Sequence, residues 1–158
     1  MRRLIILLAG GLGALALASP APAGATTTSP VTVTVGSPIT LTARALVQVP
    51  VNVVCDPLPG LPFSDEVHVG IIQASGKSIS HGEGTATASS PAFLVCDGTT
   101  VNQLAVLVTP TDVPFHGGAA ILTVFASHET GQSCGPGCFF NIQSESGGVG
   151  PVPVKIRG

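Results

Sequence analysis

The sequence predicts an all-β protein, a β-sandwich of about seven to nine antiparallel strands held together by two disulfides. Apolar residues recur at every second position in several short segments, which is the period of half-buried strands. The chain contains 20 glycines and 14 prolines, and they separate these segments at regular intervals. No segment keeps a helical period over three turns. Short strands at such spacing are typical of a sandwich.

The first 25 residues have the layout of a secretory signal peptide. Two arginines precede an apolar run, and small residues with an Ala-Gly-Ala cleavage site follow it. Cleavage after Ala25 is predicted, and cleavage after Ala18 is the alternative. A membrane anchor is the rival interpretation, which the short run and its glycines disfavour. We therefore expect residues 1–25 to be a signal peptide and residues 26–158 to form a single secreted domain.

The remaining chain shows no other targeting feature. It contains no second apolar run of about 18 residues, so no membrane span is expected after removal of the signal peptide. It also shows no carboxy-terminal sorting signal, which favours release into the medium. Four bases against eight acids give the mature chain a net charge of −4. Because no basic cluster is present, nucleic acid is excluded as a partner.

The first strands are predicted by strict alternation. Valines alternate with threonines from Val31 to Val35, and apolar residues then occupy every odd position from Ile39 to Cys55. Those 17 residues are long for one strand. Since proline cannot donate to a ladder, a bend is expected near Pro50.

Alternation returns from Val67 to Ile71, before a two-residue turn at Ser75-Gly76 and a polar edge strand over residues 77–87. Residues 101–110 and 119–127 are apolar on both phases. This pattern predicts strands that are covered on both sides. Alternating apolar residues near the end of the chain, Val152, Val154 and Ile156, predict the last strand.

Four cysteines in an exported chain predict two disulfides. Cys55 lies on the apolar phase of its strand and Cys96 ends another apolar run, so this pair closes an interval of 41 residues. Cys134 and Cys138 then pair across Gly-Pro-Gly, a sequence that turns readily. A redox motif normally has two intervening residues, and a zinc site needs four ligands, so a structural disulfide is the preferred interpretation.

Histidines and acids along residues 66–83 give a candidate metal site. With the turn at Ser75-Gly76, His68 faces Glu83, and imidazole and carboxylate ligands gather on one face of a two-stranded ribbon. The candidate ligands are Glu66, His68, His81 and Glu83. The preferred interpretation is an ordinary solvated sheet face with a cross-strand ion pair, so no metal and no cofactor are predicted.

No enzyme is predicted. The motifs G-x-S-x-G, S-x-x-K and H-E-x-x-H are absent from the sequence. His116 and His128 lie near expected strand ends, where exposed or capping roles are the expectation.

Several short motifs in a fixed order resemble those of a group of small secreted actinobacterial proteins of unknown function. They are CDGT at Cys96–Thr99, VTP at Val108–Pro110, PF at Pro114–Phe115 and GGAA at Gly117–Ala120, followed by a closing cysteine pair. The similarity covers residues 39–154. It implies an immunoglobulin-like β-sandwich and carries over no activity. Architecture alone is also similar to the neocarzinostatin-type chromoproteins, which makes a small-molecule carrier conceivable.

These observations favour a non-enzymatic extracellular binding or structural module. Its partner would be an extracellular protein or a component of the cell envelope, and an exposed apolar patch or an unpaired sheet edge is expected. One alternative is a carrier of a small ligand or metal. The other is a peptidase inhibitor with CGPGCFF as its rigid loop, in which Phe139 or Phe140 enters a specificity pocket.

Overall fold

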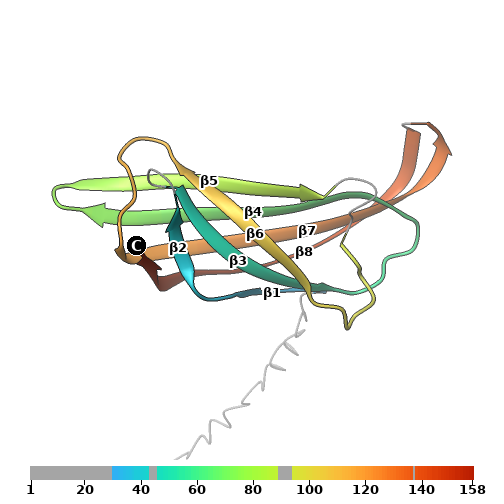
Figure 1. Ribbon diagram of the computed structural model, residues 1–158. Helices are drawn as coiled ribbons and strands as arrows, with labels where there is room; N and C mark the ends of the chain where they lie inside the picture. The colour runs from blue at the N-terminus through green and yellow to red at the C-terminus, as the bar shows by residue number, and fades with distance from the viewer. Residues whose placement is uncertain (1–29, 43–45, 89–93, 137) are drawn as a thin grey trace, which may run out of the picture.

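The computed structural model describes residues 30–42, 46–88, 94–136 and 138–158. The described residues form strands without a helix, which confirms the all-β prediction (Figure 1). Eight strands are present among them: β1 (Val31–Val35), β2 (Ile39–Thr42), β3 (Leu46–Cys55), β4 (Leu61–Ser75), β5 (Ser78–Ala88), β6 (Asn102–Pro110), β7 (Gly118–Gly135) and β8 (Cys138–Arg157). The predicted signal peptide, residues 1–25, lies outside the described residues. Within the described ranges, no helix is long and apolar enough to cross a membrane.

The strands form one sheet that closes into a seven-strand barrel. The ring runs β2, β3, β6, β5, β4, β7 and β8, and a short parallel pairing of β8 with β2 completes it. β1 continues the line of β2 along the same edge of β3. Figure 1 shows that the barrel is flattened, with β4, β5, β7 and β8 in one layer and β1, β2, β3 and β6 in the other. The sequence predicted two separate sheets, and the continuous ring is the difference.

The core lies between the two layers. Alternate positions point inward along each strand, as in β3, whose burial alternates along its whole length. Most of the filling side chains are β-branched, which suits a pleated surface. The fully buried ones include Val47, Val49, Val51, Val53, Val67, Val69, Ile71, Val106, Leu122 and Ile156.

Two glycines in β5 allow β6 to approach closely and close the ring. A Cβ at Gly82 would lie 2.6 Å from the ring of Phe115, and a Cβ at Gly84 would overlap the carbonyl of Leu107. β5 and β6 pair only at Gly82↔Pro110 and Glu83↔Thr109 among the described residues. Side chains at these glycines would therefore separate β5 from β6, where only two pairs of described residues join the strands.

The bend expected near Pro50 is wrong. Pro50 lies inside β3, and the chain reverses between Thr42 and Leu46, which are paired partners. The carbonyl of Pro50 accepts a hydrogen bond from Gly36 N–H at 2.8 Å. N–H and C=O of one residue point to the same edge of a strand. The backbone N–H that proline lacks would therefore face the gap between β1 and β2, where β3 has no ladder partner among the described residues.

The two-sided cover expected for residues 101–110 and 119–127 is also wrong. Burial alternates in both β6 and β7, so one phase of each strand faces solvent. Leu107 is 53% exposed and Phe125 is 48% exposed. Apolar residues on both phases here indicate an apolar outer surface.

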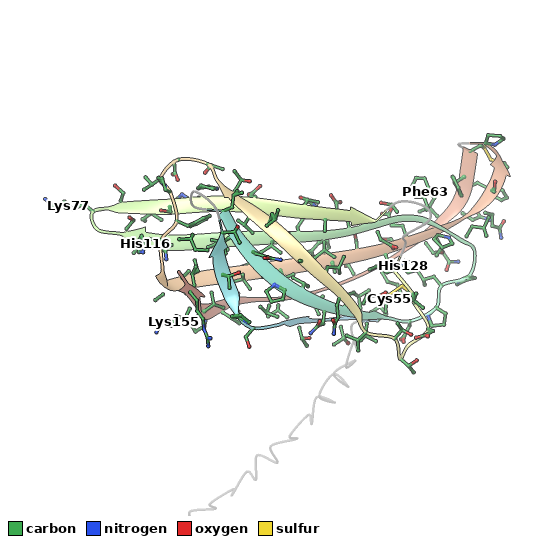
Figure 2. All side chains as sticks on the ribbon, in the orientation of Figure 1. Cys55, Phe63, Lys77, His116, His128 and Lys155 are labelled. Carbon is green, nitrogen blue, oxygen red and sulfur yellow. A yellow bond between two sulfur atoms is a disulfide. The ribbon has the colours of Figure 1, made fainter. Side chains whose placement is uncertain are left out.

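The two predicted disulfides are present. Cys55, the last residue of β3, is bonded to Cys96 in the segment before β6. Cys134 and Cys138 are bonded at the tip of the β7–β8 hairpin. Figure 2 shows the first bond beside the barrel, at the end where His128 lies, whereas the second lies at the far end of the projecting hairpin.

Candidate functional site

The outer surface of the layer formed by β4, β5, β7 and β8 carries large apolar side chains. Ile72, Ile79 and Ile121 are 49%, 54% and 41% exposed. Their neighbours along each strand point inward and fill the core, so no second layer of described residues covers these side chains. We call the group the outer-face patch: Ile72, Ala74, Ile79, Ala119, Ile121 and Pro153.

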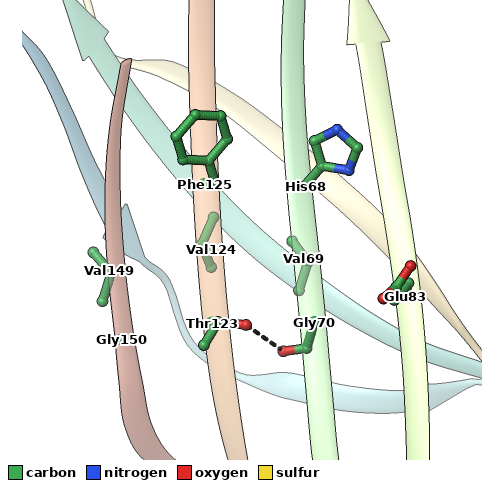
Figure 3. Close-up of a pocket in the computed structure, with 9 residues that line it drawn as sticks. All are labelled: His68, Val69, Gly70, Glu83, Thr123, Val124, Phe125, Val149 and Gly150. Carbon is green, nitrogen blue, oxygen red and sulfur yellow. Dashed lines mark hydrogen bonds between the residues drawn. The ribbon is translucent and has the colours of Figure 1, made fainter.

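A hollow of about 340 Å³ lies beside the outer-face patch (Figure 3). Gly70 forms part of its floor, and a Cβ there would approach the Thr123 hydroxyl to 2.8 Å. His68 and Phe125 are cross-strand partners, and Figure 3 shows their rings on neighbouring strands at one end of the hollow. Glu83 borders it from β5. The hollow thus combines an aromatic ring, an imidazole, a hydroxyl and a carboxylate.

The charged groups of this hollow differ in how they are held. His68 is fixed on both sides, because its Nε2 lies 2.9 Å from Glu66 Oε1 and its Nδ1 lies 3.1 Å from Thr85 Oγ1. Glu83 is exposed, and its carboxylate forms neither a hydrogen bond nor an ion pair with the part of the chain that the structure describes. The carboxylate of Glu83 is therefore available to a positively charged ligand group.

The four candidate metal ligands share this outer face but do not surround one point. The hairpin turn lies at Gly76-Lys77, since Ser75 pairs with Ser78, so the register differs by two residues from the expected one. His68 pairs with Thr85, and His81 Nδ1 lies 3.5 Å from Asp112 Oδ2. A shift of two keeps side chains on the same face.

That arrangement gives the metal hypothesis no support. Glu66 is bonded to His68, while His81 is engaged by Asp112 and Glu83 stands apart from both contacts. Among the described residues, no group of three or more His, Cys, Asp or Glu side chains is placed to hold a metal ion.

Sequence reasoning missed a buried polar pair inside the barrel. His128 was expected to be exposed or capping, but its side chain is 3% exposed and its Nδ1 lies 2.6 Å from Asp65 Oδ1. Asp65 Oδ2 accepts a hydrogen bond from Leu94 N–H at 2.7 Å. The phase could have revealed it, because His128 continues the inward series of Leu122, Val124 and Ala126. The buried pair thus connects β7, through Asp65 of β4, to the backbone of Leu94 at this end of the barrel.

The CDGT motif is a structural turn. Asp97 Oδ1 accepts hydrogen bonds from the backbone N–H groups of Thr99 and Thr100 at 2.8 and 2.6 Å, and its Oδ2 accepts one from the Thr100 hydroxyl at 2.7 Å. The Thr100 hydroxyl, followed by these amides, holds the pKa of Asp97 well below its ordinary value. Gly98 adopts φ +79° and donates its N–H to Cys55 O at 2.9 Å. The motif thus fixes the loop beside the Cys55–Cys96 disulfide.

The CGPGCFF segment forms a hairpin rather than an open loop. Ser133 pairs with Phe139 and Gly135 pairs with Cys138. The ring of Phe139 lies 4.9 Å from that of Phe63, whereas Phe140 is 46% exposed. Because the backbone beside Phe139 is already paired, the inhibitor hypothesis gains no support from this geometry.

The functional interpretation depends on this geometry alone. The chain matches no protein-family model, no curated protein and no solved structure. The outer-face patch and its hollow are therefore the candidate site on the strength of their own chemistry.

Proposed function

We propose that the protein is a secreted, non-enzymatic interaction module that binds an extracellular protein through the outer-face patch and the adjoining hollow. The partner surface presents a basic side chain surrounded by apolar ones. The observation that carries this proposal is the position of the free Glu83 carboxylate, which lies across the hollow from Phe125 and on the same face as the three half-exposed isoleucines.

The chemistry of the hollow favours a lysine or arginine. The apolar stem of such a side chain covers Gly70, and its cationic group meets the Glu83 carboxylate. The isoleucines then bury the apolar rim of the partner, which supplies most of the binding free energy. Since the mature chain has a net charge of −4, its overall field also attracts a basic partner.

An immunoglobulin-like framework is part of the proposal. Its support is the path of the chain, which crosses between the two layers after β3, after β5 and after β6. β1 pairs antiparallel with β3 in one layer, while β2 pairs parallel with β8 in the other. The first two strands together therefore contact both layers. Greek-key crossings of this kind are typical of immunoglobulin-like sandwiches. The two disulfides indicate an oxidising compartment, which agrees with secretion.

A displayed library of random peptides tests the binding proposal. Selection on the wild-type protein is expected to enrich peptides with one lysine or arginine between apolar residues. Glu83→Gln is expected to weaken their binding about tenfold, the loss of one charge-assisted contact. Ile72→Ser should weaken it similarly, because an anchor is lost.

Leu107→Ser is the matched control, because Leu107 is equally exposed on the other layer. Its binding should equal that of the wild type. Enriched peptides without a basic residue, or peptides that bind Glu83→Gln as well as the wild type, would contradict the proposal.

A further inference from the structure

The end of the β7–β8 hairpin projects beyond the barrel. β4 accompanies β7 only as far as the pair Leu61↔Gly131. From Gln132 to Phe140 the two strands pair only with each other among the described residues, and Figure 1 shows this end of the hairpin extending past the other strands. The tip is therefore a two-stranded ribbon without a supporting layer.

Such a ribbon is marginally stable in water by itself. The Cys134–Cys138 disulfide closes its end and restricts the unfolded alternatives. The base is fixed by Phe139, which lies against Phe63 and over Gly131. The chain thus holds the projecting tip in place with a covalent bond, although the tip contributes nothing to the core.

Large apolar side chains occupy both faces of this tip. Asn141 adopts φ +49° within a bulge, and Ile142 then lies over Gly131 on the same side as Phe139. Phe140 precedes the bulge, so it points to the opposite face from Phe139. We call these side chains, together with those of the adjacent start of β4, the tip patch: Leu61, Phe63, Phe139, Phe140 and Ile142.

The tip patch is free of charge. No ionisable side chain occurs in residues 57–64 or 130–144, which together form the projecting end and its flank. The acids that flank these segments are Asp56, Asp65, Glu129 and Glu145, all at the base. Cys134 lies five positions after Glu129, and a strand rises about 17 Å over that distance at about 3.4 Å per residue.

From these features we infer that the tip patch inserts into the headgroup and acyl-chain boundary of a phospholipid bilayer. A groove on a protein covers one face of a docked ribbon, whereas lipid surrounds it, and this ribbon carries a large apolar side chain on each face. Interfacial insertion reaches about 5–10 Å, so the acids at the base stay in water. The paired backbone of the ribbon limits the cost of leaving water.

The charges near the tip also determine which lipid headgroups permit binding. The tip offers no lysine or arginine to anionic headgroups, and Glu129 and Glu145 are repelled by them. Binding therefore depends on buried apolar area, and zwitterionic phosphatidylcholine vesicles suffice. Added anionic lipid should not strengthen it, in contrast to polybasic membrane-binding segments.

The absence of tryptophan from the chain gives a direct test. Protein is purified from culture medium, and its mass must show that residues 1–25 are absent. Phe140→Trp introduces a single indole at the tip. With phosphatidylcholine vesicles its fluorescence should shift to the blue and be quenched by brominated acyl chains. Leu107→Trp, at an equally exposed site on the barrel, should show neither effect.

Cosedimentation with the same vesicles measures the contribution of the tip. Phe140→Asp should reduce partitioning by about tenfold or more, because one large apolar side chain is lost and a charge is added. Leu107→Asp should leave it unchanged. Cys134→Ala/Cys138→Ala should also reduce it, since the ribbon loses its closure. Equal unfolding midpoints of Phe140→Asp and wild type show that the fold is intact.

Three results would overturn the inference: no sedimentation of the wild type with phosphatidylcholine, equal partitioning of Phe140→Asp, or an indole at position 140 that is not quenched. Binding to isolated cell envelopes but not to protein-free vesicles would identify a protein partner and equally overturn it. Glu83→Gln and Ile72→Ser should leave vesicle binding unchanged, so this test and the peptide selection fail independently.

Discussion

β7 runs through two different regions of the molecule, the barrel and the projecting tip of the β7–β8 hairpin, and each region contains one of the two disulfides. At His128 the strand is part of the barrel wall and its side chain points inward, where a buried polar pair and the nearby Cys55–Cys96 bond hold the segment before β6. Six residues later, at Cys134, the same strand has left the barrel and its disulfide stabilises an exposed apolar tip. The first disulfide therefore joins two segments of the barrel, whereas the second closes the end of a hairpin that projects from it.

The largest expected effect tests the interior region. His128→Ala leaves the Asp65 carboxylate buried without its partner, which should lower the free energy of unfolding by about 3–5 kcal/mol. Urea unfolding at neutral pH measures it. Glu66→Ala is the matched control, because it breaks the exposed pair with His68 and should cost less than about 1 kcal/mol. Equal losses in the two variants would show that the buried pair does not stabilise this end.

The two disulfides should then differ in the stability that they provide. Cys55→Ala/Cys96→Ala releases an interval of 41 residues, and the chain-entropy model gives a loss of about 4 kcal/mol. Urea unfolding of the double variant, with the wild type measured in parallel, checks the value. A loss below that of the hairpin disulfide would reverse the comparison.

Cys134→Ala/Cys138→Ala should cost less, about 2 kcal/mol at most, because only four positions separate the cysteines. The loss should also be local. Amide hydrogen exchange is expected to accelerate in residues 132–140 and to stay unchanged in β3. Faster exchange throughout the barrel would show that the tip is coupled to the core.

The smallest effect concerns the loop beside Cys96 and depends on pH. The pKa of Asp97 is lowered in the folded protein, so its carboxylate stabilises the fold above the ordinary pKa of about 3.9. This contribution is lost as the pH falls through the lower folded value. Asp97→Asn should be less stable than the wild type at pH 6, and the difference should shrink below about pH 3. A difference that stays constant with pH would contradict the assignment.

Alternation predicted most of the strands and placed Cys55 on an inward phase, whereas the Cys134–Cys138 pair followed from its spacing across Gly-Pro-Gly, and both signals are local. Val31–Val35 and the segment up to Cys55 needed only the period of a pleated strand. The closure into a barrel could not be predicted in this way. It depends on two-residue contacts between distant segments, such as Ile39↔Ile156, which leave no periodic signal in the sequence.

The candidate site was predicted in part. The sequence placed Glu66, His68, His81 and Glu83 on one face, and a turn that lies one residue later than expected moved their partners by two positions without changing that face. The sequence of residues 101–110 and 119–127 was interpreted as strands covered on both sides, but one phase of each strand is an exposed apolar surface. A run with both phases apolar has two explanations, and local sequence cannot distinguish a covered strand from an exposed binding surface.

The parallel pairing of β8 with β2 has a consequence for the folding of the nascent chain. Ile156 and Arg157 close the ring against Ile39 and Thr40, so β2 near the start of the chain and β8 at its end must both be available before the barrel exists. Contacts so distant in sequence form slowly and late. The barrel of a nascent chain therefore stays open until β8 has left the ribosome.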